Sequence, residues 1–166
     1  YETERYGDYS KPGESVYDHP FLWGSRRIGP DLSREGGRFP DLWHVRHMFN
    51  PREVTQKSIM PAYPKLQVNT IDFDDIQKHV DAMAMLGVPY GDAVNRAPQM
   101  AREQAQLIAA GIEAAGGPKG LQDKEIVALT AYLQRLGRDL KNASVPAAQA
   151  PAAPKPVSLA APGGSR

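Results

Sequence analysis

Two separated segments decide how this chain folds: residues 23–32, with the sequence WGSRRIGPDL, and residues 58–64, with the sequence SIMPAYP. About 30 residues separate Pro30 from Met60, and one short helical candidate lies between them. The Gly-Pro-Asp sequence of the first segment is typical of a turn. In the second segment two prolines follow Met60 closely and restrict the loop that carries it. The sequence therefore predicts two structured loops joined through a short helix.

Two loops of this kind can form a haem pocket. The backbone carbonyl of Pro30 can orient an imidazole, and the thioether of Met60 can bind iron, which is a common histidine/methionine ligation of haem. Each motif alone has an ordinary explanation, because Gly-Pro-Asp is common in turns and a Met-Pro pair is more often a loop residue that covers a core. The order and spacing of the two motifs favour the haem pocket.

The composition limits the kind of protein. At 166 residues, the chain is long enough for one domain, or for one domain with a tail. The net charge of +1 does not point to nucleic acid or another polyanion as the partner of this chain. With no Cys, these residues exclude disulfides, zinc thiolates, thiol catalysis and covalent haem attachment through thioethers. No run of about 18 apolar residues suggests a membrane span. Because residue 1 is Tyr, we expect the chain to start inside a longer reading frame, after processing, or at the edge of an incomplete sequence.

Helical periodicity recurs along the chain, and no segment alternates like a strand, so we predict an all-α fold with long irregular loops. Four helices are expected, at about residues 39–50, 70–87, 98–116 and 123–137. Thr70 or Asp72 is the candidate N-cap of the second helix, and Asp123 is the candidate N-cap of the fourth. Each helix has a predicted inward apolar face. In chain order the faces are Leu42, Val45, Met48 and Phe49; Phe73, Ile76, Val80 and Met83; Met100, Ala101, Ala105, Ile108 and Ile112; and Ile126, Leu129, Tyr132, Leu133 and Leu136.

Histidines are present, but none forms an obvious metal cluster. His44 and His47 lie three residues apart and could share a helix face, yet no third ligand is evident, so we interpret them as a solvated helix flank. After about residue 142 the sequence is rich in Ala and Pro and cannot bury enough apolar surface to fold. We therefore predict a domain over residues 1–140 and a disordered tail over residues 141–166.

Several longer motifs are similar to one protein family. The segments are YGDYS at 6–10, GESVYDHPFLWGS at 13–25, GPDL at 29–32, GGR at 36–38, MPAYP at 60–64, LGVPY at 86–90 and YLQRLG at 132–137. Together they resemble subunit II of cbb3-type cytochrome c oxidases, the membrane-anchored mono-haem c-type cytochrome of a bacterial respiratory complex. The resemblance covers about residues 1–140.

This resemblance implies a class I cytochrome c-like fold, in which the terminal helix packs across an N-terminal helix that bears a Cys-x-x-Cys-His haem attachment site. It implies one haem c, with Met60 as the distal ligand and with the Pro30 carbonyl orienting the proximal imidazole. The attachment motif and the anchor helix have no counterpart in these residues. The implied partners are the catalytic haem-copper subunit and other cytochrome subunits, with the domain on the periplasmic side of the bacterial inner membrane.

The residues around the two motifs complete the predicted pocket. Trp23, Ile28, Leu32, Ile59 and Tyr63 would exclude water from the haem. Arg27 and Arg38 are candidates for binding the haem propionates, and the alternative is that they are ordinary solvated arginines.

Two functions remain open from the sequence. The first is an electron-transfer subunit that carries electrons through the haem toward the oxygen-reducing subunit, and the second is a haem-less structural or docking module of the same complex. We do not expect an enzyme on its own. The sequence has no Cys nucleophile, no Gly-x-Ser-x-Gly elbow and no phosphate-binding Gly loop.

Overall fold

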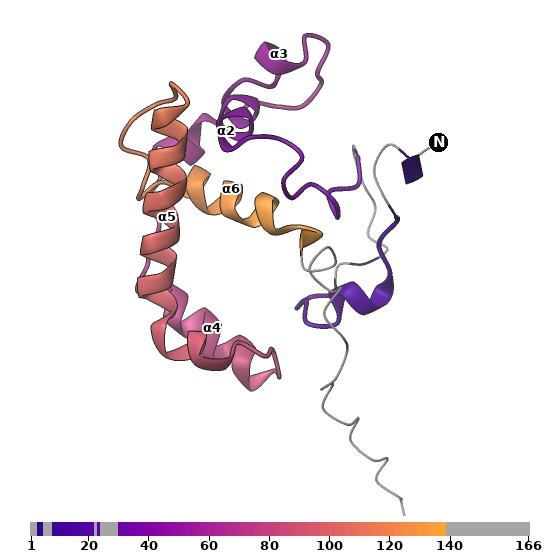
Figure 1. Ribbon diagram of the computed structural model, residues 1–166, viewed down its shortest axis with the longest axis vertical. Coiled ribbons are helices and arrows are strands. Elements are labelled where there is room, and N and C mark those ends of the chain that lie inside the picture. Colours follow the sequence, from indigo (N-terminus) through magenta and orange to yellow (C-terminus); the bar gives the residue numbers. More distant parts are fainter. Residues whose placement is uncertain (1–2, 5–7, 22, 24–29, 139–166) are drawn as a thin grey trace, which may run out of the picture.

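The helices of this protein surround a small core and leave long loops along one side (Figure 1). The computed structural model describes residues 3–4, 8–21, 23 and 30–138. Its α-helices are α2 (Asp41–Phe49), α3 (Pro51–Val54), α4 (Asp75–Met85), α5 (Ala97–Ala114) and α6 (Glu125–Arg135). Three 3-10 helices, which the sequence did not suggest, lie in the loops: η1 (Pro12–Ser15), η2 (Pro64–Gln67) and η3 (Gly91–Arg96).

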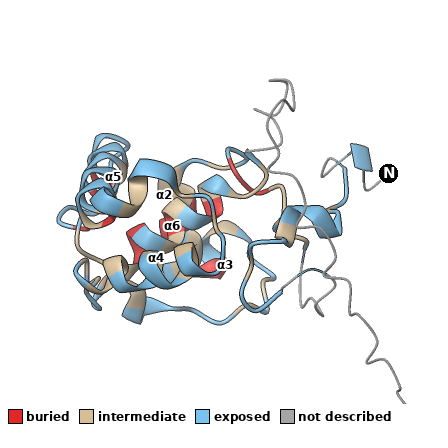
Figure 2. Cartoon of the chain, turned by 90° about the horizontal axis from the view of Figure 1, so that it is seen from below, coloured by how far each residue is buried: buried red, intermediate tan, exposed pale blue. Residues whose placement is uncertain are grey.

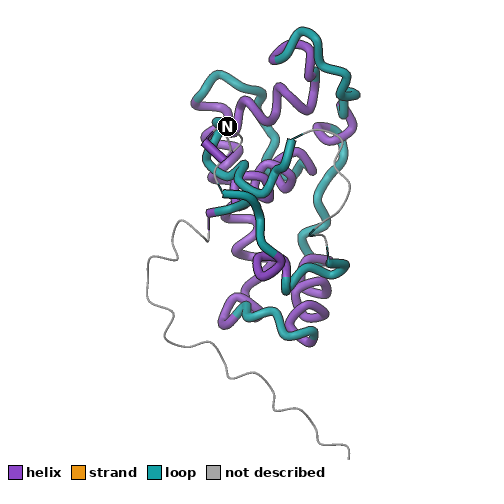
Figure 3. The backbone as a smooth tube through the Cα atoms, turned by 90° about the vertical axis from the view of Figure 1, so that its right-hand side faces the viewer, coloured by secondary structure: helices purple, strands orange, loops and turns teal. Residues whose placement is uncertain are grey.

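The described residues contain no β-strand, and the tube in Figure 3 alternates only between helix and loop. One isolated antiparallel bridge joins Thr70 to Lys124. The predicted all-α fold class is therefore confirmed. The predicted disordered tail, residues 141–166, lies outside the described residues.

The ends of α2 follow from proline and from backbone chemistry. Pro40 precedes its first residue in extended geometry, and Asn50 ends it, also in extended geometry. The Asn50 side chain accepts a hydrogen bond from the Arg52 backbone N–H, so the residue that ends α2 also starts α3. Pro51 fits the first position of α3 because an N–H there would have no partner within the helix. The predicted stop at Asn50 and Pro51 is confirmed.

The predicted N-caps lie close to the starts of the helices, but none occupies the N-cap position. Asp74 is the N-cap residue of α4, and the carboxylate of Asp72 accepts hydrogen bonds from the backbone N–H groups of Asp74 and Asp75, at 3.0 and 3.1 Å, as the helix begins. Asp123 does not cap α6. Lys124 occupies the N-cap position, and the Asp123 carboxylate contacts the Lys124 ammonium group at 3.4 Å instead. That prediction was wrong by one residue, because the Asp123 carboxylate pairs with the neighbouring ammonium group rather than with a backbone N–H.

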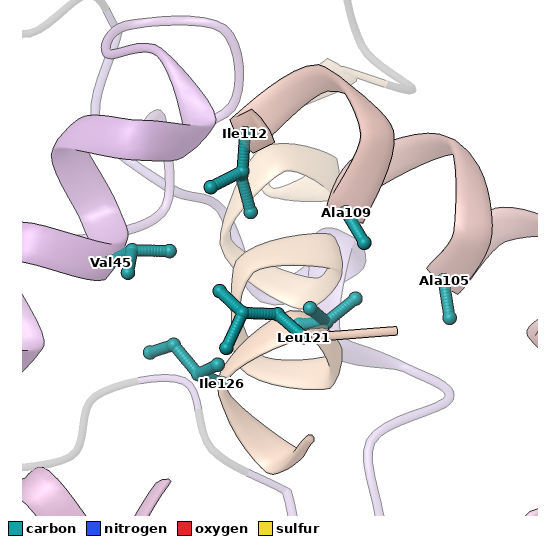
Figure 4. Close-up of a cluster of buried hydrophobic side chains, with 7 residues drawn as sticks. Val45, Ala105, Ala109, Ile112, Leu121 and Ile126 are labelled. Carbon is teal, nitrogen blue, oxygen red and sulfur yellow. The ribbon is translucent and has the colours of Figure 1, made fainter. Parts of the chain in front are cut away.

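The core lies where α2, α5 and α6 meet, and buried residues gather there in Figure 2. Figure 4 shows Val45 of α2, Ile112 of α5 and Ile126 of α6 pointing toward one another. The cluster consists of Val45, Ala105, Ala109, Ile112, Leu121, Ile126 and Val127. Burial of side chains of this size supplies most of the favourable free energy of folding.

Three of the residues predicted to point inward are exposed, namely Phe49, Met100 and Tyr132. On α5 the buried line instead follows Ala97, Ala105 and Ala109 at helical spacing, and Met100 lies off that line. On α6, Thr130 is buried and its hydroxyl donates to the Ile126 carbonyl at 2.8 Å, which satisfies the polar group within the helix. Tyr132 then lies on the opposite side of α6.

Candidate functional site

The loop that carries Met60 is tied to α2. The Tyr63 backbone N–H donates to the Met48 carbonyl in α2 at 2.8 Å, and the Met60 N–H donates to the Ser58 hydroxyl at 3.2 Å. The 3-10 helix η2 begins directly afterwards at Pro64. Met60 itself is half-buried. The predicted distal ligand is therefore held in an ordered loop whose end is fixed to a helix, which is what a thioether ligand requires.

The turn that contains Pro30 is attached to the end of α6. Asp31 accepts a hydrogen bond from the Ser33 N–H at 2.9 Å, which closes an Asx turn after the exposed Pro30. Farther along, the Gly36 N–H donates to the Leu136 carbonyl at 2.9 Å. A Cβ atom at Gly36 would lie 2.5 Å from that carbonyl oxygen, so only glycine allows this close approach.

Gln134 of α6 strengthens the same attachment with its side-chain amide. Its oxygen accepts from the Gly37 N–H at 2.8 Å, and its nitrogen donates to the Phe39 carbonyl at 2.8 Å and to the Asp41 carboxylate at 2.7 Å. We call residues 33–41 together with Gln134 and Leu136 the α6 clasp. The α6 clasp connects the Pro30 turn to α2, so both predicted loops are positioned from the same pair of helices.

Four apolar residues predicted to line the pocket are exposed in this chain. Ile59 is 91% exposed, and Leu32, Tyr63 and Trp23 are each exposed to a smaller degree. The Trp23 indole N–H donates to the Ser10 carbonyl at 3.0 Å. Exposed apolar side chains are compatible with a covering apolar group, but their role as a water-excluding wall stays a prediction. Ile28 and Arg27 lie outside the described residues.

Arg38 is exposed, and it contacts residues of its own segment. Its guanidinium lies 3.9 Å from the Glu35 carboxylate and 5.3 Å from the centre of the Phe39 ring. Burial raises the pKa of Glu35, and the charge of Arg38 opposes this shift. Arg38 also borders a groove of about 750 Å³ between the α6 clasp, α5 and α6, and Met60 is not among the residues that line it. Propionate binding by Arg38 stays a prediction.

The two histidines of α2 are the largest departure from the sequence interpretation. His44 is only 1% exposed and His47 is half-buried, so the predicted solvated flank is wrong. The reason is an aromatic stack. The centre of the Trp43 ring lies 3.9 Å from the centre of the Phe39 ring and 4.5 Å from the centre of the His47 ring, and the ring planes are nearly parallel in both pairs. His44 meets Trp43 edge to face at 5.3 Å. The spacing of four residues between Phe39, Trp43 and His47 was a sequence signal for this stack.

Each of these histidines has a buried ring nitrogen without a partner. Among the described residues, neither Nε2 of His44 nor Nδ1 of His47 makes a hydrogen bond. Burial lowers the pKa of both rings, and for His44 the charge of Asp41 opposes the shift while His47 adds to it. Neutral imidazoles with buried free nitrogens are unusual, because native proteins satisfy nearly all buried polar groups.

The described residues fit part of a haem site. Met60 offers a soft thioether, and exposed apolar side chains lie next to it and in the Pro30 turn. Neither thioether attachment nor a proximal ligand is provided by the residues named here, since the chain has no Cys. No group of three or more His, Cys, Asp or Glu in the described part could hold a separate metal ion.

Within the described ranges, no helix is both long and apolar enough to cross a membrane.

Comparison with known proteins identifies the family. A search of curated proteins found no match. Residues 1–140 match the family described as "Cytochrome C oxidase, mono-heme subunit/FixO". This match covers most of the chain and includes both the Pro30 turn and the Met60 loop. The chain therefore belongs to the FixO family, the mono-haem subunit of cbb3-type cytochrome c oxidase.

Proposed function

We propose that this chain forms the electron-transfer domain of its oxidase, and that it carries electrons through one c-type haem toward the oxygen-reducing catalytic subunit. The observation that carries the proposal is the ordered Met60 loop, fixed to α2 by the Tyr63 to Met48 hydrogen bond, within a chain of the mono-haem family. The catalytic haem-copper subunit and other cytochrome subunits are its partners. The domain lies on the periplasmic side of the bacterial inner membrane, held by an anchor that these residues do not contain.

The bound haem would supply a single iron that accepts and releases one electron. Met60 would bind that iron through sulfur, and a soft thioether favours the reduced state and raises the reduction potential. Ile59, Tyr63 and Leu32 would exclude water around it, which raises the potential further because a low dielectric disfavours the more highly charged oxidised state. The Pro30 carbonyl would orient the proximal imidazole. No general acid, base or covalent intermediate is needed for this transfer.

A second candidate function is a haem-less docking module of the same complex. The observation that favours it is the absence of Cys from all 166 residues, since thioether attachment cannot come from them. In that case the exposed aromatic and aliphatic side chains of Phe21, Trp23, Leu32, Ile59 and Tyr63 would contact other subunits directly. The haem content of the subunit isolated from its oxidase separates the two functions: about one haem per chain supports electron transfer, and none supports the docking module.

The ligand assignment is tested by Met60→Ala in the complete, haem-loaded subunit. We expect loss of the thioether-to-iron charge-transfer absorption band and a lower reduction potential, because the soft ligand has been removed. Met85→Ala is the matched control, since Met85 lies on α4 and is 83% exposed. Retention of both the band and the potential in Met60→Ala would show that another group binds the iron.

A further inference from the structure

Three arginines gather in one part of the groove between the α6 clasp, α5 and α6. The Gly37 N–H donates to the Gln134 side chain there at 2.8 Å, and the next residue in the chain after each partner is an arginine, Arg38 or Arg135. Arg138 lies at the same place, because a Cβ atom at Gly37 would be 3.8 Å from one of its guanidinium nitrogens. All three arginines line the groove. Positive charge is therefore concentrated where the α6 clasp meets the end of α6.

The lining of the groove carries more positive than negative charge. Asp41 is the only acidic residue among the described residues that line it, and its carboxylate accepts a hydrogen bond from the Gln134 amide at 2.7 Å. Glu35, which lies 3.9 Å from the Arg38 guanidinium, does not line the groove. The groove is thus complementary in charge to an anion. Guanidinium groups suit phosphate in particular, because their N–H groups can donate paired hydrogen bonds to its oxygens.

Beside the arginines the groove is apolar. Ala131 lies one helical turn before Arg135 on α6, so the apolar part continues directly from the cationic part. Leu107 of α5 borders it and is 75% exposed. The volume of about 750 Å³ falls within the range of about 300–1,000 Å³ that is usual for small-molecule sites. The apolar lining consists of Phe39, Pro40, Leu107, Ile108 and Ala131.

An amphiphile fits this lining better than a peptide does. A peptide brings backbone N–H and C=O groups that need partners once they are covered. The Gln134 amide already makes three hydrogen bonds within the α6 clasp, which leaves Gln104 as the only other amide side chain among the described residues that line the groove. An acyl chain has no such groups, and its contact with Leu107 and Ile108 removes apolar surface from water.

We propose that the groove binds an anionic phospholipid, with the phosphate at Arg135 and Arg138 and an acyl chain over Leu107. The membrane that holds the oxidase supplies this lipid. The source of the lipid therefore rests on the proposed location of the domain, whereas the chemistry of the site does not. Met60 does not line the groove, so lipid binding is separate from the proposed binding of haem.

Native mass spectrometry of the complete, haem-loaded subunit in a neutral detergent tests the arginines. The probes are dioleoyl-phosphatidylglycerol, which is anionic, dioleoyl-phosphatidylcholine, which has no net charge, and inorganic phosphate. The variant Arg135→Gln with Arg138→Gln removes two charges from the groove. Its matched control is Arg46→Gln with Arg52→Gln, because both residues are exposed and neither lines the groove.

A second pair of variants tests the apolar part. Leu107→Asn places a polar group beside the acyl chain without disturbing the core, since Leu107 is largely exposed. Leu86→Asn is the control, because Leu86 is 58% exposed and lies outside the groove.

We expect the arginine variant to bind phosphatidylglycerol about tenfold more weakly than the wild type, because charge-assisted hydrogen bonds to the phosphate are lost. Leu107→Asn should weaken binding about threefold through the loss of apolar contact. Both controls should match the wild type. Phosphatidylcholine and inorganic phosphate should bind the wild type at least about tenfold more weakly than phosphatidylglycerol, because each lacks one half of the recognised chemistry.

Three results would overturn the proposal. Equal affinity for the two lipids, or unchanged affinity for phosphatidylglycerol in the arginine variant, would show that the arginines do not bind the headgroup. Inorganic phosphate bound as tightly as phosphatidylglycerol would show that the apolar part contributes nothing. If the arginine variant keeps its lipid but no longer co-purifies with the catalytic subunit, the groove holds a segment of a neighbouring subunit instead. The thioether-to-iron charge-transfer band reports on Met60 separately, so failure of the lipid proposal is distinct from failure of the proposed function.

Discussion

The α6 clasp gives the sharpest stability prediction. Gln134→Met keeps the length of the side chain but removes three hydrogen bonds, those to the Gly37 N–H, the Phe39 carbonyl and the Asp41 carboxylate. Each such bond contributes about 0.5–1.5 kcal/mol net. The Gly37 bond is exposed and water can replace it, so we expect a loss of about 2–3 kcal/mol in the free energy of unfolding.

The assay is urea unfolding of the complete, haem-loaded subunit, followed by circular dichroism. Gln106→Met on α5 is the matched control, because Gln106 is exposed and the same substitution there should change stability by less than about 0.5 kcal/mol. Hydrogen exchange at the Gly37 amide should also accelerate in Gln134→Met. A loss no greater than that of the control would show that the three bonds do not hold the α6 clasp together.

Two further predictions concern the core and the buried acid. Ile126→Ala should lower the free energy of unfolding in urea by about 2–5 kcal/mol, because Ile126 is 0% exposed. The control Ile59→Ala should change it by less than about 0.5 kcal/mol in the haem-free protein, because Ile59 is 91% exposed. Equal effects would refute the core assignment. Burial raises the folded-state pKa of Glu35 above its ordinary value of 4.5. The stability of the wild type should therefore decline as pH rises through the folded-state pKa. Glu35→Gln removes the ionisable group and should stabilise the protein at neutral pH. Unfolding measured from acid to neutral pH checks this sign, and the decline should be smaller in the variant.

The parts of the fold that depend on local chemistry were predictable from the sequence. Proline at 40 and 51 and the Asp72 carboxylate mark the ends of α2 and the start of α4, because their effects act within a few residues. The core stripe of α6 also followed from spacing alone, with Ile126 and Leu133 buried as expected. Local patterns fix helices well because the period of 3.6 residues is a property of the backbone.

The parts that depend on distant contacts were not predictable. Nothing near Gln134 in the sequence indicates that its amide bonds to residues 37–41, since those partners lie more than 90 residues away. His44 has the polarity of a surface residue, and only the packing of Trp43 and Phe39 around it explains its burial. The proposed haem pocket has the same character, because its candidate residues lie in loops that share no periodic pattern.

The α6 clasp has a consequence for how the protein is made. Gly37 and Gln134 are 97 residues apart, so their hydrogen bond closes most of the domain into one loop, and such long-range closure is entropically slow. Because a ribosome releases the chain from its N-terminus, the Pro30 turn must wait for α6 before it is held in place. We therefore expect the Pro30 turn to stay open through most of synthesis and to become ordered only when the last helix emerges.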